Sequence, residues 1–125
     1  PYNFDYVGDV KATDFSVSSQ VEQYLSLMRK SDDALKELIT YFKKSDEPAI
    51  ILVFGDHQPH LPDSFYEKLF GKNPVQFSRE DSMKEHLIPF MIWANYDIGE
   101  ENIERTSINY LSSLLLEKAG LKMSD

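Results

Sequence analysis

The chain has 125 residues, 42% of them hydrophobic, so it forms at most one domain of ordinary size with a packed core. Its 13 basic and 21 acidic residues give a formal net charge of −8, which argues against nucleic acid as a partner because phosphate binding needs clustered lysine and arginine. The absence of cysteine excludes disulfides and thiolate chemistry, and no apolar run is long enough to span a membrane.

Residues 1–17 mix aromatic, acidic and turn-forming residues, and we expect a loop or an extended lead-in there, unless they add a strand. Ser19 and Glu22 then have the spacing of a capping box. Apolar residues follow at helical spacing with no glycine or proline among them. The pattern predicts one long helix over about residues 19–44.

Asp32 falls on the apolar face of this predicted helix, where a carboxylate needs a partner. Two interpretations are open. The helix breaks or is capped again at the sequence SDDAL, because serine and aspartate favour caps, or Asp32 is a buried tether to a neighbouring loop. Both interpretations give Asp32 a structural role.

Two apolar segments predict strands. Residues 49–54, AIILVF, show no alternation and are rich in β-branched residues, as expected of a central strand covered on both faces. Residues 87–94, LIPFMIWA, predict a second strand. Pro89 lacks the N–H that a ladder needs, so it belongs near the start of this strand or on an edge.

The remaining segments are helical or irregular. Residues 62–71 predict a short helix whose final glycine lies just past the helix end. Residues 72–86 are polar and predict a loop with at most one helical turn, at the sequence SREDSMKEH. Residues 106–121 predict a last helix, capped by Thr106 or Ser107 and stopped by a glycine.

The resulting order of helix, strand, helix, strand, helix is typical of an α/β fold with a mostly parallel sheet. Two strands make a poor sheet. The chain also begins at Pro1 rather than at a methionine, as expected of a segment cut from a longer protein. We therefore expect a single incomplete domain over residues 1–125 that lacks the rest of its sheet.

The candidate functional residues lie where the first predicted strand ends, at Gly55, Asp56 and His57. Ligands of open α/β sheets collect at the carboxyl ends of strands, and a glycine lets the backbone turn so that adjacent side chains meet one point. A carboxylate and an imidazole suit a divalent ion such as Mn²⁺ or Zn²⁺. The alternative is that Asp56 caps a loop and His57 is an ordinary polar residue.

His60 lies three residues after His57, a spacing that resembles a zinc pair. The prolines on either side make a helix there unfavourable, so we expect His60 to face solvent or substrate. His86 precedes the second strand in a polar segment and is expected on the surface. A stand-alone zinc hydrolase that uses both His57 and His60 is the weakest interpretation, because only one carboxylate lies near them.

The blocks YLSLMRKSDDALKELITYFKKSDEPAIILVFGDHQP, LIPFMIWANYDI and TSINYLSSLLLEKAGL, in this order, closely resemble the C-terminal half of the lipoteichoic acid synthase-like sulfatase family. These bacterial membrane-anchored enzymes belong to the alkaline phosphatase and sulfatase superfamily. The resemblance runs from about Tyr24 to Leu121. It implies an α/β sandwich of which this chain is the C-terminal part.

The resemblance also implies roles. Asp56 and His57 match the family's paired metal ligands, with Mn²⁺ as the usual ion and Mg²⁺, Ca²⁺ or Zn²⁺ as alternatives. The nucleophile, a threonine or a modified cysteine or serine, lies upstream with an acidic metal ligand and matches no residue here. The pair Pro1-Tyr2 looks like the residues that directly follow a further family histidine.

The implied function is that of a metal-dependent sulfatase or phosphoglycerol transferase acting on sulfate or phosphate esters, such as a phosphoglycerol lipid. The implied location is the outer face of the bacterial cell membrane, with transmembrane anchors upstream. The isolated chain is expected to be inactive without the upstream half of its catalytic domain. The alternative is a non-catalytic binding or scaffold module with the same fold.

Overall fold

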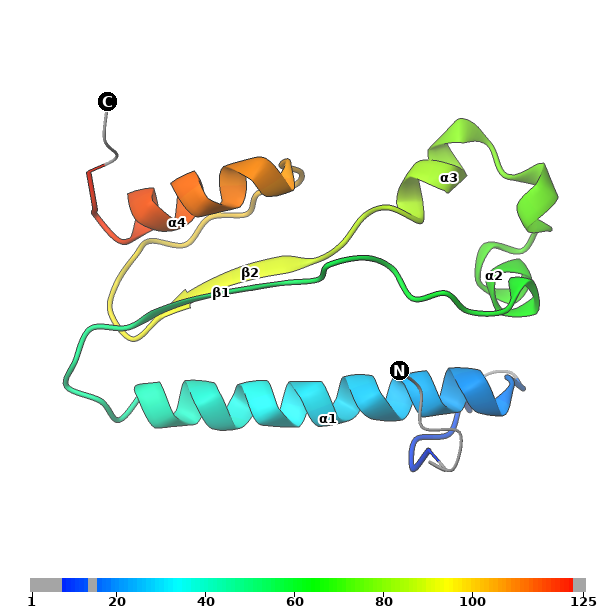
Figure 1. Ribbon diagram of the computed structural model, residues 1–125, viewed down its shortest axis with the longest axis horizontal. Helices are drawn as coiled ribbons and strands as arrows, with labels where there is room; N and C mark the ends of the chain where they lie inside the picture. The colour runs from blue at the N-terminus through cyan, green and yellow to red at the C-terminus, as the bar shows by residue number, and fades with distance from the viewer. Residues whose placement is uncertain (1–7, 14–15, 123–125) are drawn as a thin grey trace. The chain divides into compact units, whose positions relative to one another are not determined.

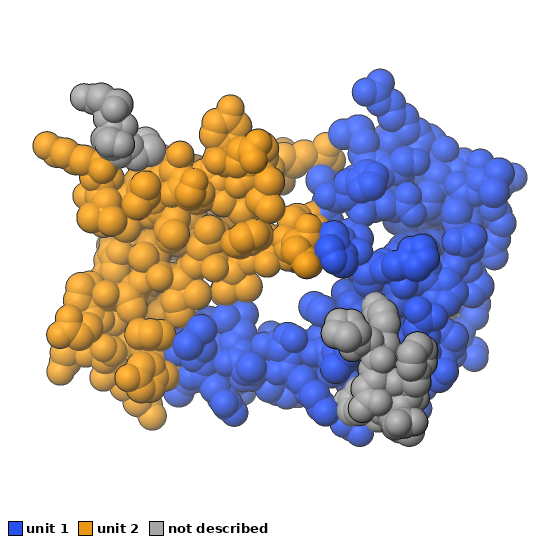
Figure 2. All heavy atoms as spheres, viewed as in Figure 1, with its two compact units in different colours: residues 1–40, 57–87 blue, residues 41–56, 88–125 orange. Residues whose placement is uncertain are grey.

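The computed structural model describes residues 8–13 and 16–122 of the chain. They divide into two units, one made of residues 8–13, 16–40 and 57–87 and the other of residues 41–56 and 88–122 (Figure 2). The chain therefore passes from the first unit to the second, back to the first, and then ends in the second. The pair Pro1-Tyr2 lies outside the described residues.

The long N-terminal helix is present as α1, Ser19–Phe42, which confirms the predicted helix (Figure 1). Its cap is one residue earlier than expected, because the hydroxyl of Ser18 accepts a hydrogen bond from the N–H of Val21 at 3.4 Å. Glu22 does not close a capping box with Ser19; its carboxylate pairs with Lys11 at 2.6 Å. The helix start is thus fixed partly by the preceding segment.

Both interpretations of Asp32 are wrong. The helix runs through it without a break, and its side chain is exposed. Several apolar residues of the predicted stripe are also exposed, among them Met28 and Leu38. Along this part of α1 the apolar stripe is only partly covered, and Asp32 itself stays in contact with solvent, so its carboxylate needs no buried partner.

The lead-in segment docks onto α1 through Ser26, which is only 2% exposed. Its hydroxyl accepts from the N–H of Val10 at 2.9 Å and donates to the carbonyl of Glu22 at 2.8 Å. A Cβ on Gly8 would lie 2.7 Å from both the Glu22 carbonyl oxygen and this hydroxyl, so only glycine fits there. The described residues before α1 contain no strand.

The two predicted strands are present as β1, Ile50–Phe54, and β2, Phe90–Ala94, and they pair with each other (Figure 1). The pairing is antiparallel, with Leu52 opposite Ile92, so the expected parallel arrangement is wrong for these strands. All ten strand residues are apolar, yet none is buried. Among the described residues β1 is only partly covered, since all of its residues except Phe54 are half-buried, so the full cover predicted for both faces is not present.

The segment between the strands is more helical than expected. It contains α2, Asp63–Phe70, a short 3₁₀ helix, Pro74–Gln76, and α3, Arg79–Lys84. Gly71 ends α2 with a φ of 68°, as predicted. The third helix lies where at most one helical turn was expected, and with 6 residues it is longer than that turn.

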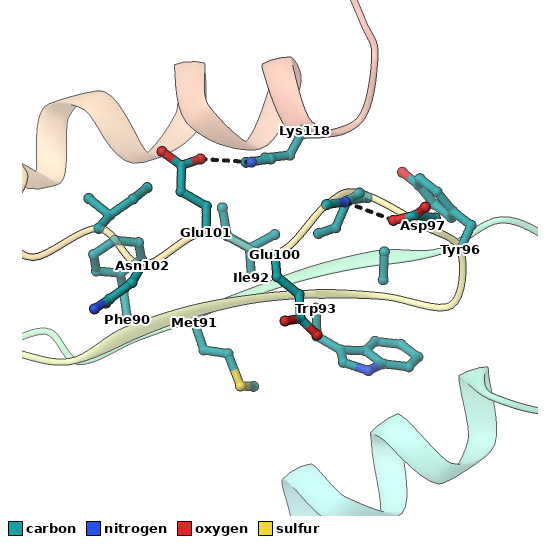
Figure 3. Close-up of a pocket in the computed structure, with 14 residues that line it drawn as sticks. Phe90, Met91, Ile92, Trp93, Tyr96, Asp97, Glu100, Glu101, Asn102 and Lys118 are labelled. Carbon is teal, nitrogen blue, oxygen red and sulfur yellow. Dashed lines mark hydrogen bonds and ion pairs between the residues drawn. The ribbon is translucent and has the colours of Figure 1, made fainter.

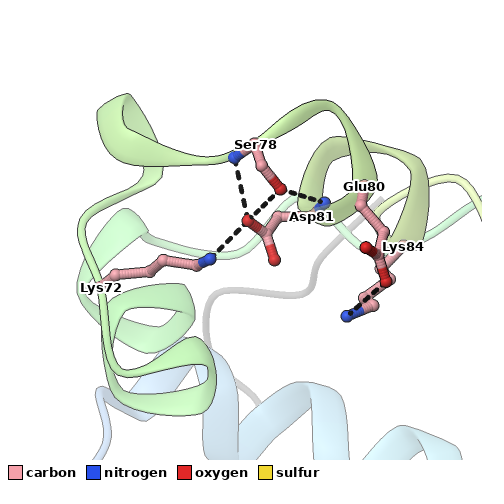
Figure 4. Close-up of polar contacts among 5 residues, drawn as sticks. All are labelled: Lys72, Ser78, Glu80, Asp81 and Lys84. Atoms are coloured by element: carbon pink, nitrogen blue, oxygen red, sulfur yellow. Dashed lines mark hydrogen bonds and ion pairs between the residues drawn. The ribbon is translucent and has the colours of Figure 1, made fainter.

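A buried carboxylate holds the start of α3 (Figure 4). Asp81 and Ser78 form a reciprocal capping box, and the same Asp81 oxygen pairs with Lys72. These hydrogen bonds, first from Lys72 and then from the hydroxyl and N–H of Ser78, hold the pKa of Asp81 well below its usual range. The cluster joins the end of α2 to α3.

Asn95, directly after β2, organises the turn that leads into β1. Its amide oxygen accepts from the N–H of Ala49 at 2.8 Å. Its amide nitrogen contacts three backbone carbonyl oxygens, those of Phe42 at 3.1 Å, Ser45 at 3.3 Å and Glu47 at 2.8 Å. One side chain therefore holds the whole connection from α1 to β1.

The C-terminal helix begins with a 3₁₀ turn, Ile108–Tyr110, followed by α4, Leu111–Lys118. Ser107 is the cap, since its hydroxyl accepts from the N–H of Asn109 at 3.4 Å. Gly120, with a φ of 69°, ends the helix as predicted. Among the described hydrophobic residues only three are buried: Val21, Leu61 and Leu111.

Replacing Asn95 by alanine is expected to lower the free energy of unfolding by about 1–3 kcal/mol, because the N–H of Ala49 and several carbonyls lose their partner. Asn95→Asp is expected to be no better, since it keeps the acceptor but loses both donors. Urea unfolding followed by circular dichroism measures this change. The exposed Asn102→Ala is the control, and equal effects of the two alanine variants would contradict the role of Asn95.

Asp81→Asn is expected to lower stability in a pH-dependent way. Because folding lowers the pKa of Asp81, its contribution is complete above the unfolded-state pKa of about 4 and disappears as the pH falls toward the lower folded-state pKa. The difference in unfolding midpoint between wild type and variant should be largest near neutral pH and shrink below about pH 4. Glu80→Gln, at an exposed neighbouring carboxylate, is the control; a difference that stays constant with pH would refute this assignment.

Candidate metal site at the end of the first strand

The first strand ends in a glycine whose role differs from the expected one. Gly55 has no positive φ; among the described glycines only Gly71, Gly99 and Gly120 do. Its N–H donates to the carbonyl of Pro89 at 3.2 Å and extends the ladder by one bond. A Cβ at this position would lie 3.4 Å from the Cβ of Ile88. Gly55 is therefore a position of close packing rather than of a special turn.

Asp56 and His57 follow directly and are both exposed. The boundary between the two units falls between them, so Asp56 ends one segment and His57 begins the next. The Nδ1 atom of His57 lies 2.8 Å from the carbonyl oxygen of Gln58. Because a carbonyl can only accept, a hydrogen bond at this contact requires the proton on Nδ1, and the neutral ring then has its lone pair on Nε2. This tautomer is the one in which Nε2 can bind a cation.

The residues after His57 are held in place by three anchors within their own unit. The amide nitrogen of Gln58 donates to the carbonyl of Leu87. The hydroxyl of Tyr66, from α2, donates to the carbonyl of Pro59 at 2.6 Å. Leu61 is only 3% exposed. This loop is therefore fixed by its backbone and by one apolar side chain, while its charged and imidazole groups stay at the surface.

His60 and His86 are both exposed, as expected. Residues 57–60 form no helix, so His57 and His60 lack the regular spacing that a zinc pair on a helix would have. No described residue forms a hydrogen bond or ion pair with His60. The assignment of His60 to substrate binding stays a prediction.

The donor set of Asp56 and His57 suits a divalent cation but is incomplete. Carboxylate oxygen and imidazole nitrogen together favour Mn²⁺ or Zn²⁺. Within the described ranges, no three His, Asp or Glu residues are grouped so that they could hold an ion. The pair can therefore supply two ligands, and a self-contained zinc site in the described part of the chain is not supported.

Two polar centres were missed by the sequence reasoning. The Lys72–Ser78–Asp81 cluster had a local signal, because serine followed three residues later by aspartate has capping-box spacing. Asn95 had no such signal, since an asparagine after a strand is a common turn residue. Both are structural, and neither belongs to the candidate metal site.

The comparison with known protein families gives the class of the protein. A mixed α/β chain with an acid–imidazole pair at the end of an apolar strand matches the sequence model of the family described as Sulfatase over residues 2–121. The chain therefore belongs to the Sulfatase family, within the alkaline phosphatase and sulfatase superfamily. The narrower likeness to lipoteichoic acid synthase stays a prediction.

Two proteins of Rhizobium meliloti (strain 1021) are similar to this chain. One, named for cyclic beta-1,2-glucan modification, is 32% identical over 117 residues, which are 90% of this chain and 18% of that protein. The other, capsular polysaccharide biosynthesis protein RkpI, is 39% identical over 46 residues, which are 37% of this chain and 9% of that protein. The chain thus spans less than a fifth of the length of either relative.

No solved structure matches the chain closely enough to add a fold comparison. Among the described residues, no helix combines the length and apolar character that crossing a membrane requires.

The packing of Gly55 predicts a graded response to substitution. Gly55→Ala should change the free energy of unfolding by less than about 1 kcal/mol, because its φ is not positive and the new Cβ meets Ile88 at ordinary contact distance. Gly55→Val should cost about 1–3 kcal/mol through overpacking. Chemical denaturation of both variants measures the difference. An equally large loss with alanine would show that Gly55 is needed for its backbone conformation instead.

Proposed function

We propose that this chain supplies two metal ligands, Asp56 and His57, to a sulfatase-family enzyme that cleaves or transfers sulfate or phosphate esters. The observation that carries the proposal is the Gly-Asp-His sequence at the end of β1 in a chain that belongs to the Sulfatase family. The remaining ligands and the nucleophile come from other parts of the longer polypeptide.

Each of the two residues has a distinct part. The carboxylate of Asp56 provides negative charge, which binds a hard cation and offsets its charge. His57 binds through Nε2, while the hydrogen bond from Nδ1 to the Gln58 carbonyl fixes the tautomer and the orientation of the ring. When bound, a divalent cation lowers the pKa of a nucleophile and stabilises charge on the transferred sulfuryl or phosphoryl oxygens.

The metal, substrate and location follow the family resemblance. We favour Mn²⁺ and a substrate on the outer face of the bacterial membrane, such as a phosphoglycerol lipid. The names of the two relatives, for glucan modification and capsular polysaccharide biosynthesis, widen the acceptor class to surface carbohydrates. Transfer of a phosphoglycerol group from a lipid to a glycan hydroxyl is consistent with both the proposed substrate and the names of the relatives. The isolated chain is inactive in this proposal because it lacks the nucleophile.

The test is metal titration of the full-length protein. Asp56→Asn and His57→Gln should each weaken Mn²⁺ binding by at least about 100-fold, because losing a direct ligand costs at least as much as losing an outer-shell partner. Isothermal titration calorimetry measures the affinity. Cleavage of a chromogenic phosphate diester should fall in parallel.

His86→Gln is the matched control, an exposed histidine in the same kind of polar segment. It should leave both affinity and activity unchanged. If Asp56→Asn and His57→Gln bind Mn²⁺ as tightly as the wild type, the two residues are not ligands, and the alternative of a non-catalytic binding or scaffold module gains support.

A further inference from the structure

The loop that begins at His57 is held by two side chains of its own segment. Residues 57–87 all belong to one unit and contain α2, the first 3₁₀ helix and α3. Their first residues, 57–62, form neither helix nor strand, so the conformation of this loop depends on its contacts with the rest of the segment. The two side chains that make these contacts are Gln58 and Tyr66.

The side chain of Gln58 joins the beginning of the segment to its end. Its amide nitrogen donates to the carbonyl of Leu87, 29 positions further along the chain. That residue is itself held, because its N–H donates to the carbonyl of Lys84 at 3.2 Å in the turn that follows α3. Since α3 is tied to the end of α2 through Lys72 and Asp81, the acceptor of the Gln58 amide lies on a fixed support.

Tyr66 holds the next residue of the loop. It is half-buried in α2, and its hydroxyl donates to the carbonyl of Pro59 at 2.6 Å. The proline ring also restricts the residue before it, Gln58, to extended backbone conformations. The direction of the Gln58 carbonyl is therefore set by the proline ring, by the Tyr66 hydrogen bond one residue later and by the tether of the Gln58 side chain.

This carbonyl is the group that lies 2.8 Å from Nδ1 of His57. When Nδ1 donates to it, Nε2 keeps its lone pair for a cation, and the direction of the carbonyl decides where the imidazole ring points. The His57 side chain is exposed, so no packing around it fixes the ring instead. Ordering a free side chain at the moment of binding costs free energy, and a ring that is already oriented avoids that cost.

We propose that Gln58 and Tyr66 are positioning residues of the metal site, which together hold the Gln58 carbonyl so that His57 presents Nε2 to a cation before the cation binds. This inference rests on the proposed function, because it needs His57 to be a ligand. Neither positioning residue binds the metal itself. Their effect goes through the imidazole ring alone, since neither hydrogen bond involves Asp56.

The chemistry of the two ligands gives a measurement that separates positioning from a general loosening of the structure. Imidazole nitrogen is a preferred ligand of Zn²⁺, whereas carboxylate oxygen is the preferred ligand of Mn²⁺. Poor presentation of His57 therefore weakens Zn²⁺ binding more than Mn²⁺ binding. A general loss of structure weakens the binding of both ions to a similar extent and also lowers the free energy of unfolding.

The test is calorimetric titration of the full-length protein with Zn²⁺ and Mn²⁺ separately. Gln58→Met keeps a side chain of similar length but removes the donor, and Tyr66→Phe removes only the hydroxyl. Each variant should weaken Zn²⁺ binding by about 10-fold, at the lower end of what the loss of an outer-shell partner costs, and Mn²⁺ binding by about 3-fold or less. His57→Gln should show a larger loss with the same preference for Zn²⁺, and Asp56→Asn should weaken Mn²⁺ binding at least as much as Zn²⁺ binding.

Gln76→Met and Tyr96→Phe are the matched controls. The side chain of Gln76 is exposed in the same segment and forms no hydrogen bond with any described residue. Tyr96 belongs to the other unit, where it lines a groove along β2 (Figure 3). Both controls should bind the two ions as the wild type does.

Zn²⁺ binding by Gln58→Met or by Tyr66→Phe that equals that of the controls would overturn the proposal. An equal loss for both ions would also overturn it and would give the two residues a structural role. If His57→Gln leaves both affinities unchanged, the proposed function is wrong and this inference with it. If His57→Gln weakens binding and the two positioning variants do not, only this inference is wrong.

Discussion

The unit that contains the sheet depends on the side chain of Asn95. An asparagine amide offers two N–H donors and one carbonyl acceptor, and here it meets three carbonyls and one N–H of the segment between α1 and β1. Two protons are shared among three carbonyls, so at least one bond is bifurcated. Because Asn95 directly follows β2, these bonds also fix where β2 ends relative to the start of β1. The register of the strand pair and the position of Asp56 at its far end both follow from this anchor.

The local parts of the fold could be read from the sequence. The long helix followed from periodicity, and Gly71 and Gly120 ended their helices as capping chemistry requires. The antiparallel pairing could not be read, because both strands are uniformly apolar and a long connection joins them. Neither feature indicates whether the two strands run parallel or antiparallel. Asp32 was misjudged because periodicity predicts which face is apolar, not whether anything covers it.

Only part of the candidate metal site could be predicted from the sequence. The sequence located the acid–imidazole pair and the strand before it, but it gave the wrong reason for Gly55. Its φ is not positive, and the group nearest to it is Ile88, a contact between residues 33 positions apart that no local pattern could indicate. The tautomer of His57 likewise depends on a backbone carbonyl that only the folded loop presents. The ligand roles of Asp56 and His57 stay predictions, as does that of His60.

The apolar strands and the incomplete ligand set have a common explanation if further chain completes both. A chain of this length and composition can bury a substantial core, yet the strands expose Phe54 and Met91, and α1 exposes Leu38 and Tyr41. Exposed apolar strand faces are costly by themselves, and two ligands hold a cation weakly. Further chain that packs against these faces would contribute the missing apolar contacts. If further chain also supplies the nucleophile and the remaining ligands, the catalytic site forms only in a protein whose sheet is complete. Stability and activity would then be gained together.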